Sequence, residues 1–341
     1  TPKPSSAASD VYKRQPLDRD GIGLDLTDYY KKLWNEFVGE VSRINYLDTK
    51  AYFITLYHLL KKYTSFVPSA VWKSEPDISL FDHSRMTCAI AECLYKNADE
   101  KYLDTIISAM SHIFHGEETS EEEKRVLEEE RFLLIGGDIS GVQSFIYSIT
   151  SKGAAKGLKG RSFYLQLLGD AIAKYTLKEL DLSIANLLYS AGGHFYILAP
   201  MGENSNESLY ENIERIMMEI HDGGLYLAVA EVPVSARDFI KDFAGKWSEI
   251  GEKLGEAKKK KFFRILNKDL FYPKIDYEDV CHSCGLPSRY KLVEEEDVRK
   301  CRLCKSLEEL TTKVARKEAV SYTHLRAHET RHDLVCRLLL E

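Results

Sequence analysis

Residues 131–200 decide the fold, and they read RFLLIGGDISGVQSFIYSITSKGAAKGLKGRSFYLQLLGDAIAKYTLKELDLSIANLLYSAGGHFYILAP. The apolar run at 132–135 fits a short buried strand, which the next two glycines end. Residues 142–147 fit either a strand or the start of a helix. Residues 152–161 are basic and glycine-rich, which predicts a loop rather than a stable helix. Ser162 is a plausible N-cap for the helix that follows.

A helix, a hairpin, a second helix and a strand are expected after this loop. One apolar face indicates the first helix and is formed by Tyr164, Leu168, Ala171, Ile172 and Tyr175. The apolar runs at 186–190 and 194–198 flank Ala191-Gly192-Gly193, which predicts a β-hairpin. A helix at 204–220 and a buried strand at 225–230 complete the order βαββαβ, which is the order of ferredoxin-like domains.

The carboxylates of this stretch bear on its chemistry. Palm-type nucleotidyl-transfer domains need acids at the end of the first strand and at the hairpin turn, where they hold two metal ions. Asp138 stands at the first place, Ser140 stands where a second acid would help, and the turn Gly192-Gly193-His194 has none. One acid cannot hold a metal pair, so we expect a palm that binds without catalysing, with Asp138 as a vestigial acid. An α/β core whose glycines only serve turns is the alternative.

Three motifs carry a family resemblance, and they occur together and in order: GDISGVQSFI at 137–146, KGRSFYLQLL at 159–168 and SAGGHF at 190–195. They resemble the first palm domain in the large polymerase/cyclase-like subunit of type III-A CRISPR effector complexes, the Csm complexes. The resemblance extends over about residues 16–320. It implies a multi-domain α+β protein with a helical HD-type nuclease remnant, a ferredoxin-like, nucleotide-cyclase-like palm, and a helical domain with a zinc-ribbon module.

The resemblance also implies function. The complete protein would cleave single-stranded DNA in its HD domain with a divalent transition metal. It would also convert ATP, with Mg or Mn, to cyclic oligoadenylates when guide RNA pairs with target RNA, in company with other Csm subunits. The second activity needs a second palm with a Gly-Gly-Asp-Asp hairpin, which this chain lacks. We therefore expect the chain to be inactive alone and to supply one wall of a nucleotide pocket, formed by Ser140, Gly141, Gln143, Gly192, Gly193 and His194.

The region 16–115 is expected to be helical. One helix is predicted at 49–63, and a second begins near Asp82 and buries an apolar stripe, with Cys88 and Cys93 as core thiols. In the resembled family this region is the rear of the HD domain, and Asp82 and His83 lie in its late motif. These two residues cannot build a nuclease site alone, so an N-cap role for Asp82 is the alternative.

Two charged segments accompany these elements. Residues 116–130 are strongly acidic, which predicts a solvated helix or linker before the palm. The basic loop, with Lys152, Lys156, Lys159 and Arg161, is the better candidate for phosphate contact, because its glycines let a phosphate approach the backbone. The four lysines at 258–261 are more typical of a solvated face.

Cys281, Cys284, Cys301 and Cys304 form the second strong motif, with the spacing C-x2-C-x16-C-x2-C. Two such turns can aim four thiolates at one point, which is the tetrahedral site that zinc prefers. Four protein ligands leave no open position, so we expect the zinc to be structural.

Composition sets the outer bounds. The chain has 341 residues, 44% of them hydrophobic, and a net charge of −6, so any nucleic-acid contact must be a local basic patch. Seven cysteines, four in paired C-x-x-C units, favour a reduced, cytoplasmic setting. There is no signal peptide and no apolar run of about 20 residues, so no membrane partner is expected. Thr1 in place of Met suggests a fragment.

The expected domains follow from these segments: extraneous, adapter-like tails at 1–15 and 320–341, the HD-type remnant at 16–115, the acidic linker at 116–130, the palm at 131–234, and the zinc-bearing helical domain at 235–319. Two other readings stay open. One is a stand-alone nucleotide cyclase, and the other is a non-enzymatic zinc-ribbon module that binds nucleic acid or protein.

Overall fold

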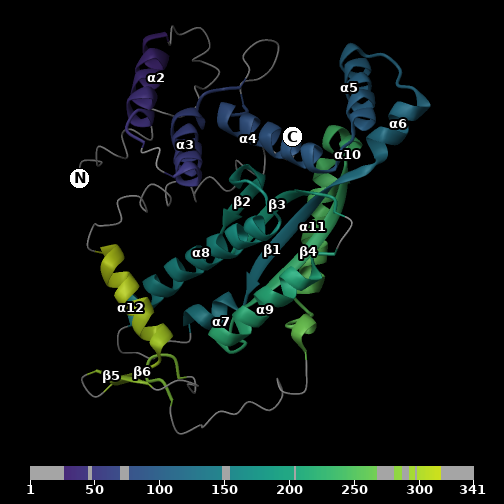
Figure 1. Cartoon of the computed structure of the whole chain (residues 1–341). Helices are drawn as coiled ribbons and strands as arrows, with labels where there is room; N and C mark the ends of the chain where they lie inside the picture. The colour runs from purple at the N-terminus through teal and green to yellow at the C-terminus, as the bar shows by residue number, and fades with distance from the viewer. Residues whose placement is uncertain are drawn as a thin grey trace. The chain divides into compact units, whose positions relative to one another are not determined.

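The computed structural model describes residues 27–44, 48–69, 77–147, 154–202, 205–266, 280–285, 292–295 and 298–315 (Figure 1). The expected tails at 1–15 and 320–341 lie outside these residues. Internal contacts divide the chain into two units, residues 1–90 and 91–341, and each is described by itself. The mixed helix-and-sheet architecture is confirmed. The boundaries proposed for the individual domains stay predictions.

The first unit contains α2 (Thr27–Val41), α3 (Thr49–Thr64) and the first half of α4 (Leu80–Asn97). Asp48 caps α3 by accepting a hydrogen bond from the backbone N–H of Ala51, so the predicted helix is confirmed. The rings of Phe37 and Tyr63 meet edge-on at 5.7 Å and join α2 to α3.

The start of α4 corrects two predictions. The hydroxyl of Ser79 accepts a hydrogen bond from the backbone N–H of Asp82 at 3.0 Å, as an N-cap does. Asp82 therefore lies in the first turn of α4 and is not its N-cap. The two predicted core thiols also differ in burial: Cys93 is buried, as predicted, whereas Cys88 is exposed. The apolar face of this helix is therefore narrower than the sequence indicates.

Of the two forms predicted for the acidic segment, a solvated helix or a linker, the helix is confirmed. It is α6 (Glu121–Glu128), which packs on α5 (Glu100–His115) through a small apolar cluster. Ser120 and Glu123 form a capping box at its start. Glu123 is only 5% exposed and accepts a hydrogen bond from Ser108 at 2.7 Å, which corrects the expected solvated position of this acid.

A four-stranded antiparallel sheet is the centre of the second unit. Its strands are β1 (Glu130–Ser140), β2 (Leu187–Ala191), β3 (His194–Pro200) and β4 (Tyr226–Ser235), in the order β2-β3-β1-β4. With α8 (Ala154–Glu179) and α9 (Glu207–His221) between the strands, the chain follows the predicted βαββαβ order. A short 3-10 helix, η2 (Ile184–Asn186), leads into β2.

Strand β1 is longer than predicted because Gly136 and Gly137 continue it instead of ending it. A Cβ atom at Gly137 would collide with the ring of Phe195, and one at Gly136 would lie 2.9 Å from Ile250. Glycine is therefore required here by close packing on both faces of the sheet rather than by a turn.

Helices cover both faces of this sheet (Figure 1). Leu133, Ile135 and Ile139 of β1 share a buried cluster with residues of α8 and α9. The opposite face of β1 packs on α11 (Phe243–Ala257), where Ile250 and Leu254 are buried. Between β4 and α11 lies the short α10 (Ala236–Lys241), and η3 (Phe263–Ile265) follows α11.

The segment between β1 and the hairpin differs most from prediction. Residues 142–147 form the helix α7 (Val142–Tyr147), and α8 begins at Ala154, so the expected basic loop is helical over most of its length. Ser162 lies inside α8 and is not an N-cap. Gly160 allows α8 to contact the helix that contains Leu307 closely, because a Cβ atom there would collide with the carbonyl oxygen of Leu307. A close helix contact compensates for the low helical propensity of glycine.

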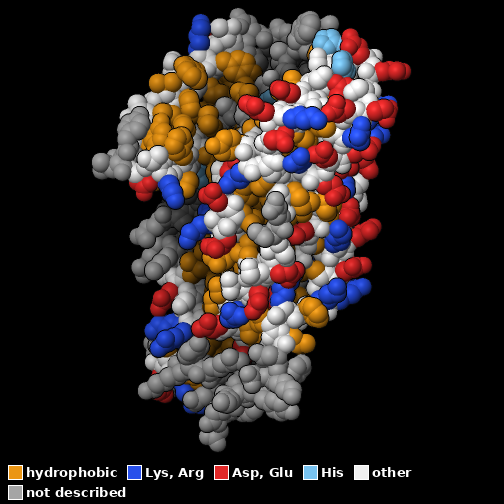
Figure 2. Space-filling view, turned by 45° about the vertical axis from the view of Figure 1, so that its right-hand side comes forward, with side chains coloured by type: hydrophobic (Ala, Val, Ile, Leu, Met, Phe, Trp, Pro, Cys, Tyr) orange, Lys and Arg blue, Asp and Glu red, His pale blue; other side chains and the backbone are white. Residues whose placement is uncertain are grey.

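The last described elements are β5 (Val293–Glu295), β6 (Val298–Lys300) and α12 (Arg302–Ala315), which packs against α8. Acidic and basic side chains are interspersed over the face shown in Figure 2. Among the described helices, none is both long and apolar enough to cross a membrane.

Candidate functional site

The end of β1 and the turn of the hairpin meet at one edge of the sheet. Asp138 stands opposite His194 in the β1–β3 register, and the backbone N–H of Ile139 donates to the carbonyl of Gly193 at 2.9 Å. Gly192 and Gly193 have φ values of 62° and 87°, a backbone conformation that glycine adopts at little cost. Asp138, the Gly-Gly turn and His194 are thus brought together as predicted.

Asp138 is 4% exposed, and its carboxylate is held by two neighbours. The Nδ1 atom of His194 lies 3.3 Å from Oδ2, and Nζ of Lys258 contacts the same oxygen. Lys258 follows the last residue of α11, so this helix supplies a cation to the end of β1. The only group of three or more metal-binding side chains in the described residues is made of cysteines, so Asp138 lacks the partners of a metal-pair site.

The remaining predicted nucleotide contacts lie next to this edge. Ser140 ends β1, and Gly141 has a φ of 89°. A Cβ atom at Gly141 would collide with the carbonyl of Gly224, so this turn is packed against the start of β4. Gln143 is exposed in the first turn of α7. The chain around this edge therefore offers a glycine turn, the amide of Gln143 and the imidazole of His194.

Two residues of this edge were not predicted as part of it. One is Lys258, which the sequence places in a lysine run that looks like a solvated face. The other is Asp170 of α8, whose Oδ1 accepts a hydrogen bond from Ser190 at 2.5 Å. Lys261 also folds back, donating to the carbonyl of Gly223 at 2.6 Å. No local pattern marks these lysines, because their partners, Asp138 on β1 and Gly223 in the turn before β4, are distant in the sequence.

Two of the four basic residues of the predicted phosphate loop, Lys159 and Arg161, have side chains that the structure describes. Lys152 lies outside the described residues, and Lys156 lies in α8, where its side chain is not described. Lys159 is exposed. Arg161 is 3% exposed, and its guanidinium donates to the backbone oxygen of Phe145. The guanidinium is thus bonded inside the protein, and the phosphate contact expected of these basic residues stays a prediction.

The four cysteines converge as predicted. The sulfur atoms of Cys281, Cys284, Cys301 and Cys304 all lie within 4.8 Å of one another. A tetrahedral zinc with Zn–S distances of about 2.3 Å needs sulfurs about 3.8 Å apart, so the donor set fits zinc. Cys281 and Cys304 are buried and the other two are half-buried. Four sulfur donors complete a tetrahedron, so this set leaves no open coordination position.

Local turns aim these thiols at one point. Gly285, with a φ of 70°, closes the first turn by donating its N–H to the carbonyl of Cys281 at 2.8 Å. Cys301 follows β6, and its backbone N–H donates to Sγ of Cys281 at 3.2 Å. Cys304 lies in the first turn of α12. Hydrogen bonds from Cys284 and the other thiols lower the pKa of Cys281, which favours the thiolate that binds metal.

Asp82 and His83 do not form a metal site with other described residues. Asp82 pairs with Arg85 at 3.0 Å and bonds to Ser79, while His83 is exposed. The described residues of the first unit contain no third ligand near them. The predicted relation of this region to an HD nuclease therefore stays a prediction.

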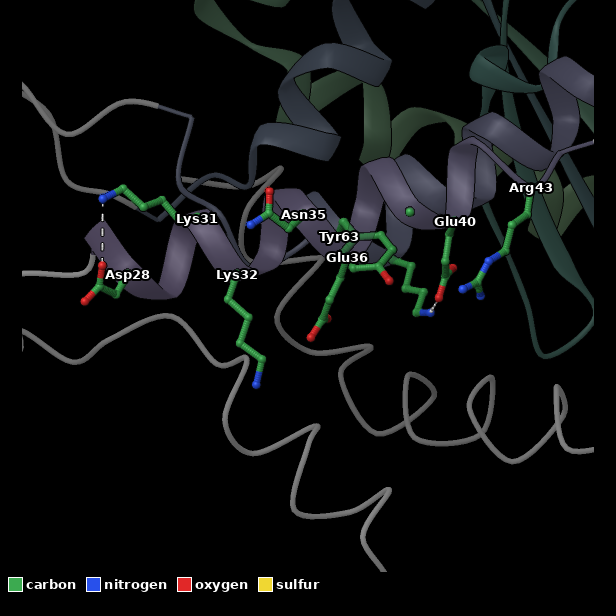
Figure 3. Close-up of a pocket in the computed structure, with 10 residues that line it drawn as sticks. Asp28, Lys31, Lys32, Asn35, Glu36, Glu40, Arg43 and Tyr63 are labelled. Atoms are coloured by element: carbon green, nitrogen blue, oxygen red, sulfur yellow. Dashed lines mark hydrogen bonds and ion pairs between the residues drawn. The ribbon is translucent and has the colours of Figure 1, made fainter.

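A hollow of about 800 Å³ lies between α2 and α3 of the first unit (Figure 3). Its charged side chains largely pair with one another, as shown by Lys31 with Asp28 at 3.8 Å and Lys62 with Glu40 at 2.7 Å. This pairing leaves a mixed surface rather than a patch of one sign, so we assign it no ligand.

Comparisons with known proteins identify similar sequences and structures. Residues 131–274 match the family model described as Csm1 subunit domain B. The chain is 37% identical over 283 residues to the CRISPR system single-strand-specific deoxyribonuclease Cas10/Csm1 (subtype III-A) of Methanocaldococcus jannaschii, covering 74% of this chain and 34% of that protein. It is 33% identical over 305 residues to the protein of the same name from Mycobacterium tuberculosis, covering 82% and 36%.

Solved structures show the same relationship. The crystal structure of a Csm1–Csm4 cassette in complex with cA4 matches with a TM-score of 0.53 and 29% identity, over 80% of this chain and 35% of that one. The cassette in complex with one ATP matches with a TM-score of 0.52 and 29% identity, over 80% and 36%.

Fold and site together define a class, namely α+β proteins in which a βαββαβ sheet is joined to a four-cysteine centre. Within that class the chain is homologous to the Cas10/Csm1 large subunit of type III-A CRISPR effector complexes. It spans about a third of the length of the curated relatives it matches.

Proposed function

We propose that residues 131–234 form a palm that supplies one wall of a nucleotide pocket without catalysing, within the large subunit of a type III-A effector complex. The observation that carries this proposal is the edge where β1 meets the hairpin turn. There the backbone is glycine-rich, and the two carboxylates are already engaged: Asp138 is paired with Lys258 and His194, and Asp170 accepts a hydrogen bond from Ser190. Such an edge suits a nucleotide better than a pair of metal ions.

The relatives support a wider role for the complete protein. Their names describe a deoxyribonuclease specific for single strands, and the solved relatives hold ATP or cA4 beside Csm4. On this basis the complete protein would cut single-stranded DNA with a metal-dependent HD domain. It would also make cyclic oligoadenylates from ATP with Mg or Mn, together with Csm4, guide RNA and target RNA. The four cysteines would hold structural zinc.

The two other readings fit less well. A stand-alone cyclase needs several acids at the turn, and Asp138 is internally paired. An independent zinc-ribbon module needs a separate surface, whereas α12 packs on α8 at Gly160.

ATP binding and turnover by the purified chain test the proposal. Gln143→Ala should weaken ATP affinity about fivefold, because the variant loses one hydrogen bond to the nucleotide. Ser144→Ala, an exposed neighbour on α7, should leave affinity unchanged. The chain alone should make no cyclic product, and robust product formation would overturn the proposal.

A further inference from the structure

A buried guanidinium links the four-cysteine centre to the helix that follows β1. Arg161 lies on α8 and is 3% exposed. One of its amino groups donates to Sγ of Cys304 at 3.7 Å, and the other donates to the backbone oxygen of Phe145 on α7. Its guanidinium carbon also lies 5.2 Å from the centre of the Phe145 ring. Burying a cation is costly, so these contacts must compensate for lost hydration.

The charge of a metal centre explains why a cation is placed there. Four thiolates around a divalent ion carry a net charge of about −2. Cys304 is 4% exposed, so water does little to stabilise that charge. A guanidinium that donates to a thiolate sulfur lowers the excess negative charge and orients the ligand. Gly160, next to Arg161, lets α12 come close enough for this contact.

The second contact of Arg161, with Phe145, connects it to the turn at Gly141. The backbone N–H of Phe145 donates to the carbonyl of Gly141 at 3.0 Å. Cys304, Arg161, Phe145 and Gly141 therefore form a continuous series of contacts from the cysteines to the end of β1. Any shift of the cysteine turns would move the hydrogen-bond partner of Arg161 and loosen α7.

We propose that Arg161 is a positioning residue with two roles. It stabilises the metal-loaded four-cysteine centre as a cationic hydrogen-bond donor to Cys304, and it transmits the order of that centre to α7. The second role deepens the proposed nucleotide function, since α7 carries Gln143. The first role does not depend on nucleotide binding at all.

Zinc affinity of the full chain, measured by competition with a chromophoric chelator, tests the first role. Arg161→Met should weaken zinc affinity about 10- to 100-fold. Arg161→Lys keeps the charge but cannot reach Cys304 and Phe145 together, so its affinity should fall less. Lys159→Met, an exposed residue on the same helix, should bind zinc like the wild type.

Amide hydrogen exchange at residues 142–147 tests the second role. Exchange there should rise when zinc is stripped from the wild type, and it should already be raised in zinc-loaded Arg161→Lys. If Arg161→Met fails to fold, the zinc affinity and amide exchange of Arg161→Lys test the proposal. Zinc affinity in that variant within about twofold of wild type, with unchanged exchange on α7, overturns the proposal. These readouts use no nucleotide, so a failure of ATP binding alone would contradict only the proposed function.

Discussion

Lys258, just beyond the end of α11, pairs with the buried carboxylate of Asp138 near the end of β1. The two residues are far apart in sequence, and their contact fastens the helix to the edge of the sheet. The ion pair therefore gives a buried carboxylate a cation from a distant part of the same chain.

Removing this cation should destabilise the fold. Lys258→Met leaves the Asp138 charge buried with a weaker partner, so we expect the free energy of unfolding to fall by about 2 kcal/mol. Denaturant titration measures this change. Lys259→Met, at the exposed neighbouring position, should change stability by less than about 0.5 kcal/mol. Equal stabilities for the two variants would show that the ion pair contributes little.

Gly137 should not tolerate a side chain. Gly137→Ala places a methyl group against the ring of Phe195, and overpacking of this kind costs about 1–3 kcal/mol or more. Gly251→Ala is the matched control, because no atom lies within 4 Å of a Cβ there and alanine favours helix. Thermal unfolding should show a lower Tm for the first variant and an unchanged or higher Tm for the second. A neutral Gly137→Ala would mean that Phe195 can move aside.

Loss of one cysteine ligand should empty the metal centre. Cys301→Ser should reduce bound zinc from about one ion per chain to a small fraction, because the remaining thiols no longer complete a tetrahedral site. Elemental analysis gives the stoichiometry, and circular dichroism should show less helix as α12 loosens. Cys88→Ser, at an exposed cysteine of the first unit, should retain zinc. Full zinc binding by Cys301→Ser would exclude the four-thiolate centre.

The free energy of unfolding should fall as the pH is lowered, because buried His221 then takes up a proton. Burial lowers the pKa of His221 from 6.5 to about 4, and its Nε2 lies 3.2 Å from the hydroxyl of Tyr164. The unfolded chain binds the proton more tightly, so this contribution is complete above about pH 6.5 and is lost as the pH falls toward about 4. Unfolding free energies measured at several pH values should decline less steeply in His221→Gln than in wild type.

A matched change at an exposed histidine completes this test. His83→Gln should retain the wild-type slope, since His83 lies in solvent. If the unfolding free energy of His221→Gln changes with pH as steeply as that of the wild type and of His83→Gln, another group controls stability in acid.

The sequence alone determined those features that depend on local periodicity and spacing. The βαββαβ order follows from apolar runs, helical faces and glycine turns, and the cysteine centre follows from two C-x-x-C units. The absence of an acid from the hairpin turn is also a property of the sequence. Each of these signals lies within a few residues of the element that it predicts.

Only the tertiary structure decided which residues meet across the fold. Gly136 and Gly137 end a strand by local rules, yet they continue β1 because Phe195 and Ile250 fill the space beside them. The local sequence predicts a solvated Lys258, whereas the fold places this residue, at the end of α11, beside Asp138. The local sequence predicts Arg161 as a phosphate contact, whereas the packing of α12 buries it beside Cys304. The physical reason is the same in each case: packing between distant segments overrides local propensity, and no local pattern encodes the partner.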